Sequence, residues 1–239
     1  MIKFTLAEEA LQPRMDFPEL PKVQLRPSER NFLEKLIDSQ SLIFLHATQP
    51  SNLPSILKEG LIPRSSHEFR NLKAPSINDG FRSGHGAVCF SIGWLNTKTL
   101  RSWGPIGKFV AIEIDASIIL RKSWFAFHTN SSAKECSDKF AQRPSAFCGR
   151  VALERLFLPT SFTNMGRTIV RDEIGLGATL PNDPQAEFVI DEVIEPWWIN
   201  RIIFPTAATL SEFKDSAAFS PKGPELVCDP RSFGPRIDL

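Results

Sequence analysis

A single carboxylate stands in an otherwise apolar run near the end of the chain. The run is Gln185-Ala186-Glu187-Phe188-Val189-Ile190, and it follows a polar loop that holds Gly and Pro. Burying an unpaired carboxylate in a strand is costly, so a lone glutamate in such a place suggests a function. A carboxylate of this kind can accept a proton or stabilise a developing positive charge. A glutamate at a sheet edge that faces water is the alternative interpretation.

A second segment, far upstream, combines a histidine with hydroxyl and amide groups. It reads Phe44-Leu45-His46-Ala47-Thr48 and continues as Asn52-Leu53, Ile56-Leu57 and Gly60-Leu61. A histidine at the end of an apolar strand can be a structural residue, and Thr48 can be a turn residue. Asn52 can belong to the N-terminal cap of the following helix. The two segments taken together favour one active site built from both ends of the chain.

Hydrophobic periodicity and capping residues predict the elements that position these groups. A stripe of Phe32, Leu33, Leu36 and Ile37 after Ser28 predicts a helix to Asp38, and a second helix is expected from Ser51 to Gly60. Further helices are expected at 132–140, 150–157 and, weakly, 207–218. Strands are expected at 42–45, 87–91, 108–114, 123–127, 188–193 and 201–204. Residues 64–86 and 159–184 are expected to be loops.

The order of these elements does not repeat as βαβ units, so the sequence predicts an α+β fold. Strands from distant parts of the chain would meet in one sheet. Neither GxGxxG nor GxxxxGK[ST] occurs, and neither a Rossmann nor a P-loop phosphate site is expected.

Composition excludes several classes of protein. With 42% hydrophobic and 23% charged residues among 239, the chain is an ordinary globular one. A net charge of +1 gives no overall attraction to nucleic acid, so any basic surface must be local. The four cysteines form no CxxC pair, which argues against a zinc site and favours a reducing cytoplasm. Because the cysteines are scattered, no bound metal is expected. No apolar run approaches the length of a membrane span, so no contact with a membrane is expected either.

Three segments together resemble DarT-type nucleic-acid ADP-ribosyltransferases. The segment from Phe44 to Leu61 is similar to the family's opening motif, a strand ending in His-x-Thr before an "NL..IL..GL" helix. Residues 185–199 resemble the closing "QAEFLV…VP…I" motif, and residues 124–133 resemble the central segment more loosely. The order and spacing agree over residues 42–204. The resemblance implies a split-sheet ADP-ribosyltransferase core with a cleft for NAD, which is the substrate.

The resemblance also implies roles for individual residues. Glu187 would stabilise the positive charge that develops on ribose C1′ as nicotinamide leaves, and would accept a proton from the nucleophile. His46, assisted by Thr48, would bind the adenosine-side ribose. The backbone at Ala47 would hold the nicotinamide amide, and Asn52 would bind ribose or phosphate.

The chain departs from the family at one motif. DarT-type enzymes carry "NPRSPM" after the second strand, whereas this chain reads Cys89-Phe90-Ser91-Ile92-Gly93-Trp94 and has no arginine there. Ser91 and Trp94 are expected to face the cleft, and Phe90 or Trp94 to stack on nicotinamide. A cation for the pyrophosphate would come from elsewhere. The candidates are Arg82, included among the NAD-binding residues, and Arg64 and Arg101.

The loop before Glu187 is the expected reader of the acceptor. It offers aromatic, amide and basic groups that suit a base and a phosphate. The candidate acceptor-binding residues are Phe162, Asn164, Arg167 and Arg171. Carboxylates lie in the same loop, so a solvated loop with no ligand is the alternative.

We therefore expect an arm and helix at 1–40, an ADP-ribosyltransferase-like catalytic domain at 41–205 and a C-terminal extension at 206–239. The expected activity is NAD-dependent transfer of ADP-ribose to a base of single-stranded DNA or RNA, in a toxin or phage-defence effector with a possible antitoxin partner. An RNA 2′-phosphotransferase, which shares the His-x-Thr opening, is one alternative. A catalytically silent module that binds NAD or a partner protein is another.

Overall fold

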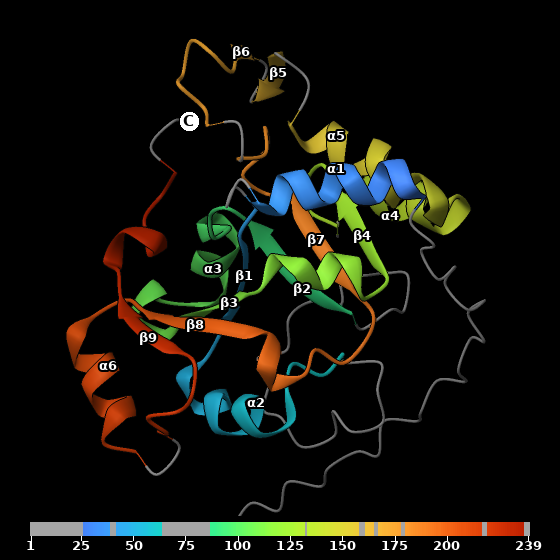
Figure 1. Ribbon diagram of the computed structural model, residues 1–239. Coiled ribbons are helices and arrows are strands. Elements are labelled where there is room, and N and C mark those ends of the chain that lie inside the picture. Colours follow the sequence, from blue (N-terminus) through green and yellow to red (C-terminus); the bar gives the residue numbers. More distant parts are fainter. Residues whose placement is uncertain are drawn as a thin grey trace, which may run out of the picture.

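The computed structural model describes residues 26–38, 42–63, 87–131, 133–157, 161–164, 167–177, 180–216 and 219–236. Its centre is a mixed seven-stranded sheet with the strand order β4-β7-β2-β1-β3-β8-β9 (Figure 1). All neighbouring strands are antiparallel except β8 and β9, which are parallel. The fold is thus α+β, as the sequence predicts. Strands close in space come from both ends of the chain, since β7 lies beside β2.

The strands of the main sheet are β1 (Phe44–Thr48), β2 (Val88–Ile92), β3 (Val110–Ile114), β4 (Trp124–Phe127), β7 (Glu187–Ile190), β8 (Ile199–Phe204) and β9 (Glu225–Cys228). A separate hairpin consists of β5 (Ser161–Asn164) and β6 (Arg167–Val170). The α-helices are α1 (Pro27–Asp38), α2 (Leu53–Glu59), α3 (Thr97–Trp103), α4 (Lys134–Gln142), α5 (Gly149–Phe157) and α6 (Ala207–Lys214). Short 3₁₀ helices are η1 (Pro50–Asn52), η3 (Ile106–Lys108), η4 (Ala116–Leu120), η5 (Pro144–Phe147), η6 (Pro196–Trp198) and η7 (Pro230–Phe233).

The two faces of the sheet are covered differently. One face carries a single large apolar cluster, in which Phe44, Phe90 and Phe188 pack under helices such as α1 and α5. The opposite face carries two separate clusters. One surrounds Leu45 and Ala111 near α3, and the other surrounds Phe127 and residues of α4 and η5. We call the line between these two clusters the seam.

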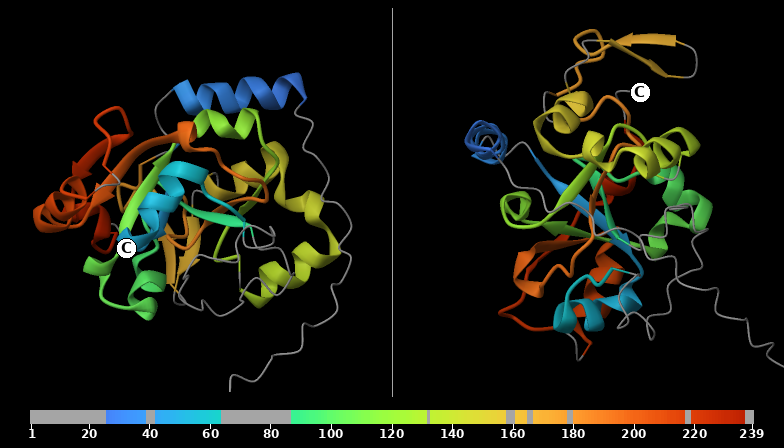
Figure 2. Two further views of the ribbon diagram at one scale, coloured as in Figure 1. Left: turned by 90° about the horizontal axis from the view of Figure 1, so that it is seen from below. Right: turned by 90° about the vertical axis from the view of Figure 1, so that its right-hand side faces the viewer.

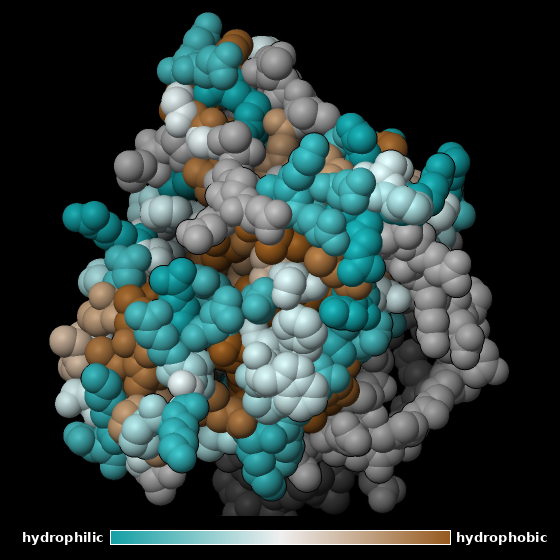
Figure 3. Space-filling view, viewed as in Figure 1, coloured by the Kyte–Doolittle hydropathy of each residue, from teal (hydrophilic) through white to brown (hydrophobic). Residues whose placement is uncertain are grey.

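Figure 2 shows the helices arranged on both sides of the sheet, with the β5–β6 hairpin projecting from the body. Hydrophilic residues cover the outer surface of α1, and hydrophobic ones show in the band below it (Figure 3). None of the described helices is both long and apolar enough to cross a membrane.

Helix α2 and its ends show why the chain turns where it does. Ser51 does not cap this helix as expected. It lies in η1, and Asn52 precedes the first helical residue without a side-chain cap bond. Gly60 ends the helix with φ of 88°, a left-handed conformation that favours glycine. Leu61 then pairs with Ile194, which ties the end of α2 to the segment after β7.

Two other expectations change. The expected loop at 159–184 was wrong in part, because it contains the β5–β6 hairpin, with Asn164 opposite Arg167. Residues 206–239, expected as an extension, supply α6 and also the sheet strand β9, which lies beside β8. The expected helices at 27–38, 132–140, 150–157 and 207–218 correspond to α1, α4, α5 and α6.

Candidate active site

Glu187 is the first residue of β7, and two donors from the turn after β4 hold its carboxylate. The Asn130 side-chain amide donates to Oε1 at 3.1 Å, and the Ser131 backbone N–H donates to Oε2 at 2.8 Å. The turn reaches the carboxylate because Phe127, the last residue of β4, lies directly opposite Glu187 in the ladder. Both carboxylate oxygens are therefore fixed in direction, which suits a group that must face a reacting atom.

The environment of Glu187 opposes its negative charge. Burial raises the pKa of this carboxyl, while hydrogen bonds from the side chain and backbone N–H of Ser131 lower it, and the nearby charge of Asp183 raises it again. The net shift is upward. A half-buried carboxylate interacts more strongly with a positive charge that forms beside it than a carboxylate in open water does.

Ser91 lies directly opposite Glu187 on the neighbouring strand β2. Its hydroxyl oxygen accepts a hydrogen bond from the Asn96 backbone N–H at 3.0 Å. The side-chain oxygen Oδ1 of Asn96 caps α3 by accepting from the Thr99 backbone N–H, and its amide Nδ2 is buried with no partner among the described residues. A buried amide donor without a partner beside Ser91 is a group that a bound ligand can satisfy.

The sheet register aligns these residues across the strands. Phe127, Glu187, Ser91 and Leu45 are opposite one another in turn, so their side chains share one face. This face is the one with two apolar clusters; Leu45 belongs to one of them and Phe127 to the other. Glu187 and Ser91 therefore lie on the seam, where polar side chains separate the two apolar regions.

His46 lies where the sheet begins to split. The ladder between β1 and β2 covers only the pairs Phe44–Ile92 and Leu45–Ser91, whereas β1 pairs with β3 along its full length. Beyond the last pair, His46 Nδ1 lies 2.9 Å from the Cys89 carbonyl oxygen, so the imidazole bridges the two strands. Because a carbonyl oxygen only accepts, Nδ1 carries a proton in this hydrogen bond. By alternation, His46 is on the face opposite to Glu187.

A hydrogen bond joins Thr48, the last residue of β1, to Asn52, the last residue of η1. Asn52 Nδ2 donates to Thr48 Oγ1 at 3.1 Å, and Thr48 is buried. This bond ties η1 to the strand. Ala47, between His46 and Thr48, is half-buried and packs against the Leu45 cluster.

Two aromatic residues expected to contact nicotinamide have other partners. Phe90 is only 1% exposed, and its ring packs against Phe44 in the large apolar cluster. The Trp94 indole N–H donates to the Gly234 carbonyl oxygen at 3.0 Å. Trp94 thus fastens the C-terminal segment beside the end of β2, and Phe90 offers no open ring face.

Arg171, expected to bind the acceptor, is buried and holds the loop before β7. Its guanidinium donates to the carbonyl oxygens of Gly177 and Leu180, each at 3.0 Å, and to the Asn182 side chain. The strands β5 and β6 contain Phe162, Asn164 and Arg167, whose side chains lie outside the described part of the structure. Arg82 and Arg64 are likewise outside it, and Arg101 is exposed on α3.

Sequence reasoning did not select Asn130, Ser131 or Asn96 as site residues. Two signals were available: the looser resemblance of residues 124–133 to the family's central segment, and the position of Asn130 and Ser131 shortly after a buried strand, where small polar side chains commonly bond to nearby backbone or side-chain groups. Neither signal identifies their partner. The partner is identified only by the pairing of β4 with β7, which brings Asn130 to Glu187 although the two residues are 57 positions apart in the sequence.

No protein-family model matches the sequence, and no curated protein matches it either. Solved structures do match. Thermosipho africanus DarTG in complex with ADP-ribose gives a TM-score of 0.53 at 14% identity, covering 80% of this chain and 50% of that one. Thermus sp. 2.9 DarT in complex with ADP-ribosylated ssDNA gives a TM-score of 0.51 at 11% identity, covering 80% of this chain and 96% of that one.

The protein has the fold of the DarT ADP-ribosyltransferases. The chain spans half the length of the Thermosipho DarTG chain and nearly all of the Thermus DarT chain. At these identities the likeness to DarT shows the fold alone. Among the described residues, no three His, Cys, Asp or Glu side chains are grouped so that they could hold a metal ion.

Proposed function

We propose that this protein is an NAD-dependent ADP-ribosyltransferase that modifies a base of single-stranded DNA or RNA. The observation that carries the proposal is the carboxylate of Glu187, half-buried on the seam of a DarT-type sheet and held by Asn130 and Ser131. The solved DarT relatives were bound to ADP-ribose and to ADP-ribosylated ssDNA, and these are the ligand classes expected here.

The residues suit NAD as the substrate. Glu187 stabilises the positive charge at ribose C1′ as the bond to nicotinamide breaks, and then takes the proton of the attacking nucleophile. The unsatisfied Asn96 amide and the Ser91 hydroxyl provide polar groups one strand away from that carboxylate. His46, oriented by its bond to Cys89 where the β1–β2 ladder ends and on the sheet face opposite to Glu187, binds a ribose hydroxyl, with Thr48 and the Ala47 backbone nearby.

The proposed contacts differ from those expected from sequence at two positions. Phe90 is in the core, and Arg171 supports the loop before β7. Neither is included among the residues that contact NAD or the acceptor. Asn52 acts through Thr48, with which it shares a hydrogen bond, and Trp94 is included as the residue that fixes the tail beside the site.

The test is transfer of label from NAD to separate pools of single-stranded DNA, RNA and protein, with wild type beside Glu187→Gln. Glutamine keeps the size of the side chain, and the Asn130 amide can turn to pair with it. We expect label in a nucleic-acid pool with wild type, and at least about a hundredfold less with the variant. Label only in protein, or equal label with both enzymes, would contradict the proposal.

The same experiment separates the alternatives. A 2′-phosphotransferase needs arginines for the RNA phosphate and does not need Glu187, so it would release a cyclic phosphate of ADP-ribose from 2′-phosphorylated RNA with either enzyme. A silent module would bind NAD without turnover. The two-donor support of the Glu187 carboxylate favours the transferase. A role as a toxin or phage-defence effector, with an antitoxin partner, belongs to the same proposal.

A further inference from the structure

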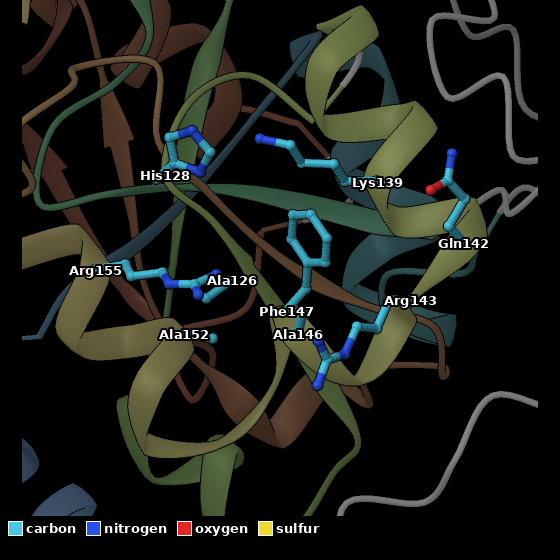
Figure 4. Close-up of a pocket in the computed structure, with 9 residues that line it drawn as sticks. All are labelled: Ala126, His128, Lys139, Gln142, Arg143, Ala146, Phe147, Ala152 and Arg155. Atoms are coloured by element: carbon cyan, nitrogen blue, oxygen red, sulfur yellow. The ribbon is translucent and has the colours of Figure 1, made fainter.

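A basic pocket lies at the outer edge of β4, close to the turn that holds Glu187. It encloses about 260 Å³ and is formed by His128 after β4, by the end of α4, by η5 and by α5 (Figure 4). The lining residues are Ala126, His128, Lys139, Gln142, Arg143, Ala146, Phe147, Ala152 and Arg155.

The lining carries three cationic side chains, those of Lys139, Arg143 and Arg155, and no carboxylate. His128, Lys139, Arg143 and Arg155 are exposed at the rim. Lys139 pairs with Glu135 at 2.7 Å, and His128 is close enough to help lower the Glu135 pKa, so one acid sits beside this rim. Arg143 and Arg155 form no ion pair within the described part of the chain. The pocket therefore has an excess of positive charge, in a protein whose net charge is only +1.

Below the rim, the pocket is apolar. Figure 4 shows the Phe147 ring at its centre, with the basic side chains around it, and alanines complete the lining. An apolar floor under a cationic rim suits a nucleotide unit, whose base can pack on apolar side chains and whose phosphate attracts guanidinium groups. Phe147 belongs to that floor and packs from below against Phe127 and Phe140. The volume is below the range of about 300–1,000 Å³ that is usual for pockets that hold a whole small ligand. One nucleotide is therefore a better match than the complete NAD molecule.

The position of the pocket connects it to the proposed reaction. His128 is two residues before Asn130 and three before Ser131, the two residues that hold Glu187. One strand, β4, separates the pocket from Glu187, because Phe127 and Glu187 are direct partners. Ala126 lines the pocket and by alternation lies on the sheet face opposite to Phe127 and Glu187. An acceptor strand with one base at Glu187 would therefore pass around the outer edge of β4 to reach the rim.

We propose that this pocket binds a nucleotide of the single-stranded nucleic-acid acceptor next to the modified base, with its phosphate on Arg143 and Arg155. This inference rests on the proposed function, because it assumes that the acceptor base meets Glu187. It assigns acceptor binding to α4, η5 and α5, in addition to the loop before β7.

The test is binding of a fluorescent single-stranded oligonucleotide to the full chain, measured by anisotropy at several salt concentrations. The variant is the double substitution Arg143→Gln and Arg155→Gln. The control is Arg121→Gln, an exposed arginine near the other end of β4 without an ion pair to a described residue. Two further arms use an oligonucleotide with a neutral methylphosphonate backbone and NAD alone. Thermal melting checks that each variant is folded.

We expect the double variant to bind the oligonucleotide at least about tenfold more weakly, and its salt dependence to fall by about 1.4 in slope if two phosphate contacts are lost. The control should behave as wild type, and the neutral backbone should remove the difference between wild type and the double variant. An unchanged affinity and slope in the double variant would overturn the inference. The inference would also be overturned if the double variant lost affinity for NAD together with affinity for the oligonucleotide, because the pocket would then bind NAD. The two proposals can fail separately. If the protein transfers no ADP-ribose but the double variant still binds the oligonucleotide more weakly than wild type, the proposed reaction is contradicted and the pocket assignment stands.

Discussion

Glu187 is a carboxylate whose surroundings push its pKa in opposite directions. Burial raises the pKa, and the hydrogen bonds from Ser131 lower it. Because the folded pKa is above the ordinary value, the folded protein keeps this proton to higher pH than the unfolded chain does. The contribution of Glu187 to stability is therefore fully present below the unfolded pKa, and is lost as the pH rises through the folded pKa. The proposed reaction needs the charged form of Glu187, so the activity is expected to rise over the same pH range.

Replacing Ser131 by alanine tests this balance. The Ser131→Ala variant keeps the backbone N–H that donates to Oε2 and loses the hydroxyl. We expect the acid limb of the pH profile for nicotinamide release to move to higher pH, because the charged carboxylate loses one of its hydrogen bonds. The rate on the high-pH plateau should change less. A uniform loss of rate at every pH would show that Ser131 affects the fold and not the Glu187 pKa.

At this scale the sequence supports the choice of Glu187 and His46, because each is a polar residue at the end of an apolar run. It does not reveal that Phe90 faces the core side of β2 or that Trp94 bonds to Gly234, since both facts depend on which face of a strand a residue occupies and on what packs there. A shift of one residue in register reverses that face.

At the scale of elements, the contact between the end of α2 and the segment after β7 links the two halves of the site. Gly60 ends α2 in a left-handed conformation, and a Cβ on it would lie 2.2 Å from the Ile194 carbonyl oxygen. The next residue, Leu61, pairs with Ile194. This close approach joins the end of α2, the helix that follows His46, to the segment that follows Glu187 and β7.

We therefore expect Gly60→Ala to destabilise the protein by more than about 1 kcal/mol, from both backbone strain and the clash. The measurement is the free energy of unfolding in urea. Gly107→Ala is the matched control, because Gly107 has no positive φ and nothing lies within 4 Å of the added Cβ. An equal effect of the two substitutions would rule out a special requirement for glycine at position 60.

The elements themselves were largely predictable, since α1 and α5 and the buried strands follow hydrophobic periodicity. The β5–β6 hairpin was missed although its strands contain the β-branched residues Thr163, Thr168 and Ile169. The density of Gly, Pro and Asn around it favoured a loop. The strand β9 is short and half-exposed, and its membership of the sheet comes from the tertiary pairing with β8.

At the scale of the whole molecule, two buried arginines from distant segments fix the loop before β7. Arg171 follows β6, and Arg236 belongs to the C-terminal segment. Arg236 donates to the carbonyl oxygens of Pro181 at 2.7 Å and Asn182 at 3.3 Å. The same segment receives the Trp94 bond at Gly234, so the tail connects the end of β2 with the approach to Glu187.

We expect Arg236→Gln to lower stability by about 1–3 kcal/mol, because buried carbonyl groups lose their charged donor. It should also lower the rate of transfer, since the loop that leads to Glu187 loses one of its supports. Arg231→Gln, an exposed residue of the same segment, is the control and should change neither quantity. Thermal melting and transfer assays on both variants decide whether the tail supports the site. A wild-type rate and melting temperature in Arg236→Gln would refute that role.

The central claim is that Glu187 transfers ADP-ribose from NAD to a nucleic-acid base. The most direct measurement is the intact mass of single-stranded oligonucleotides of defined sequence after incubation with NAD and the protein. The account predicts that one of them gains the mass of a single ADP-ribosyl group with wild type, and that the gain is lost with Glu187→Gln. It would be contradicted if the Glu187→Gln variant produced the same mass gain, or if no oligonucleotide of DNA or RNA gained mass under conditions where the wild-type protein binds NAD.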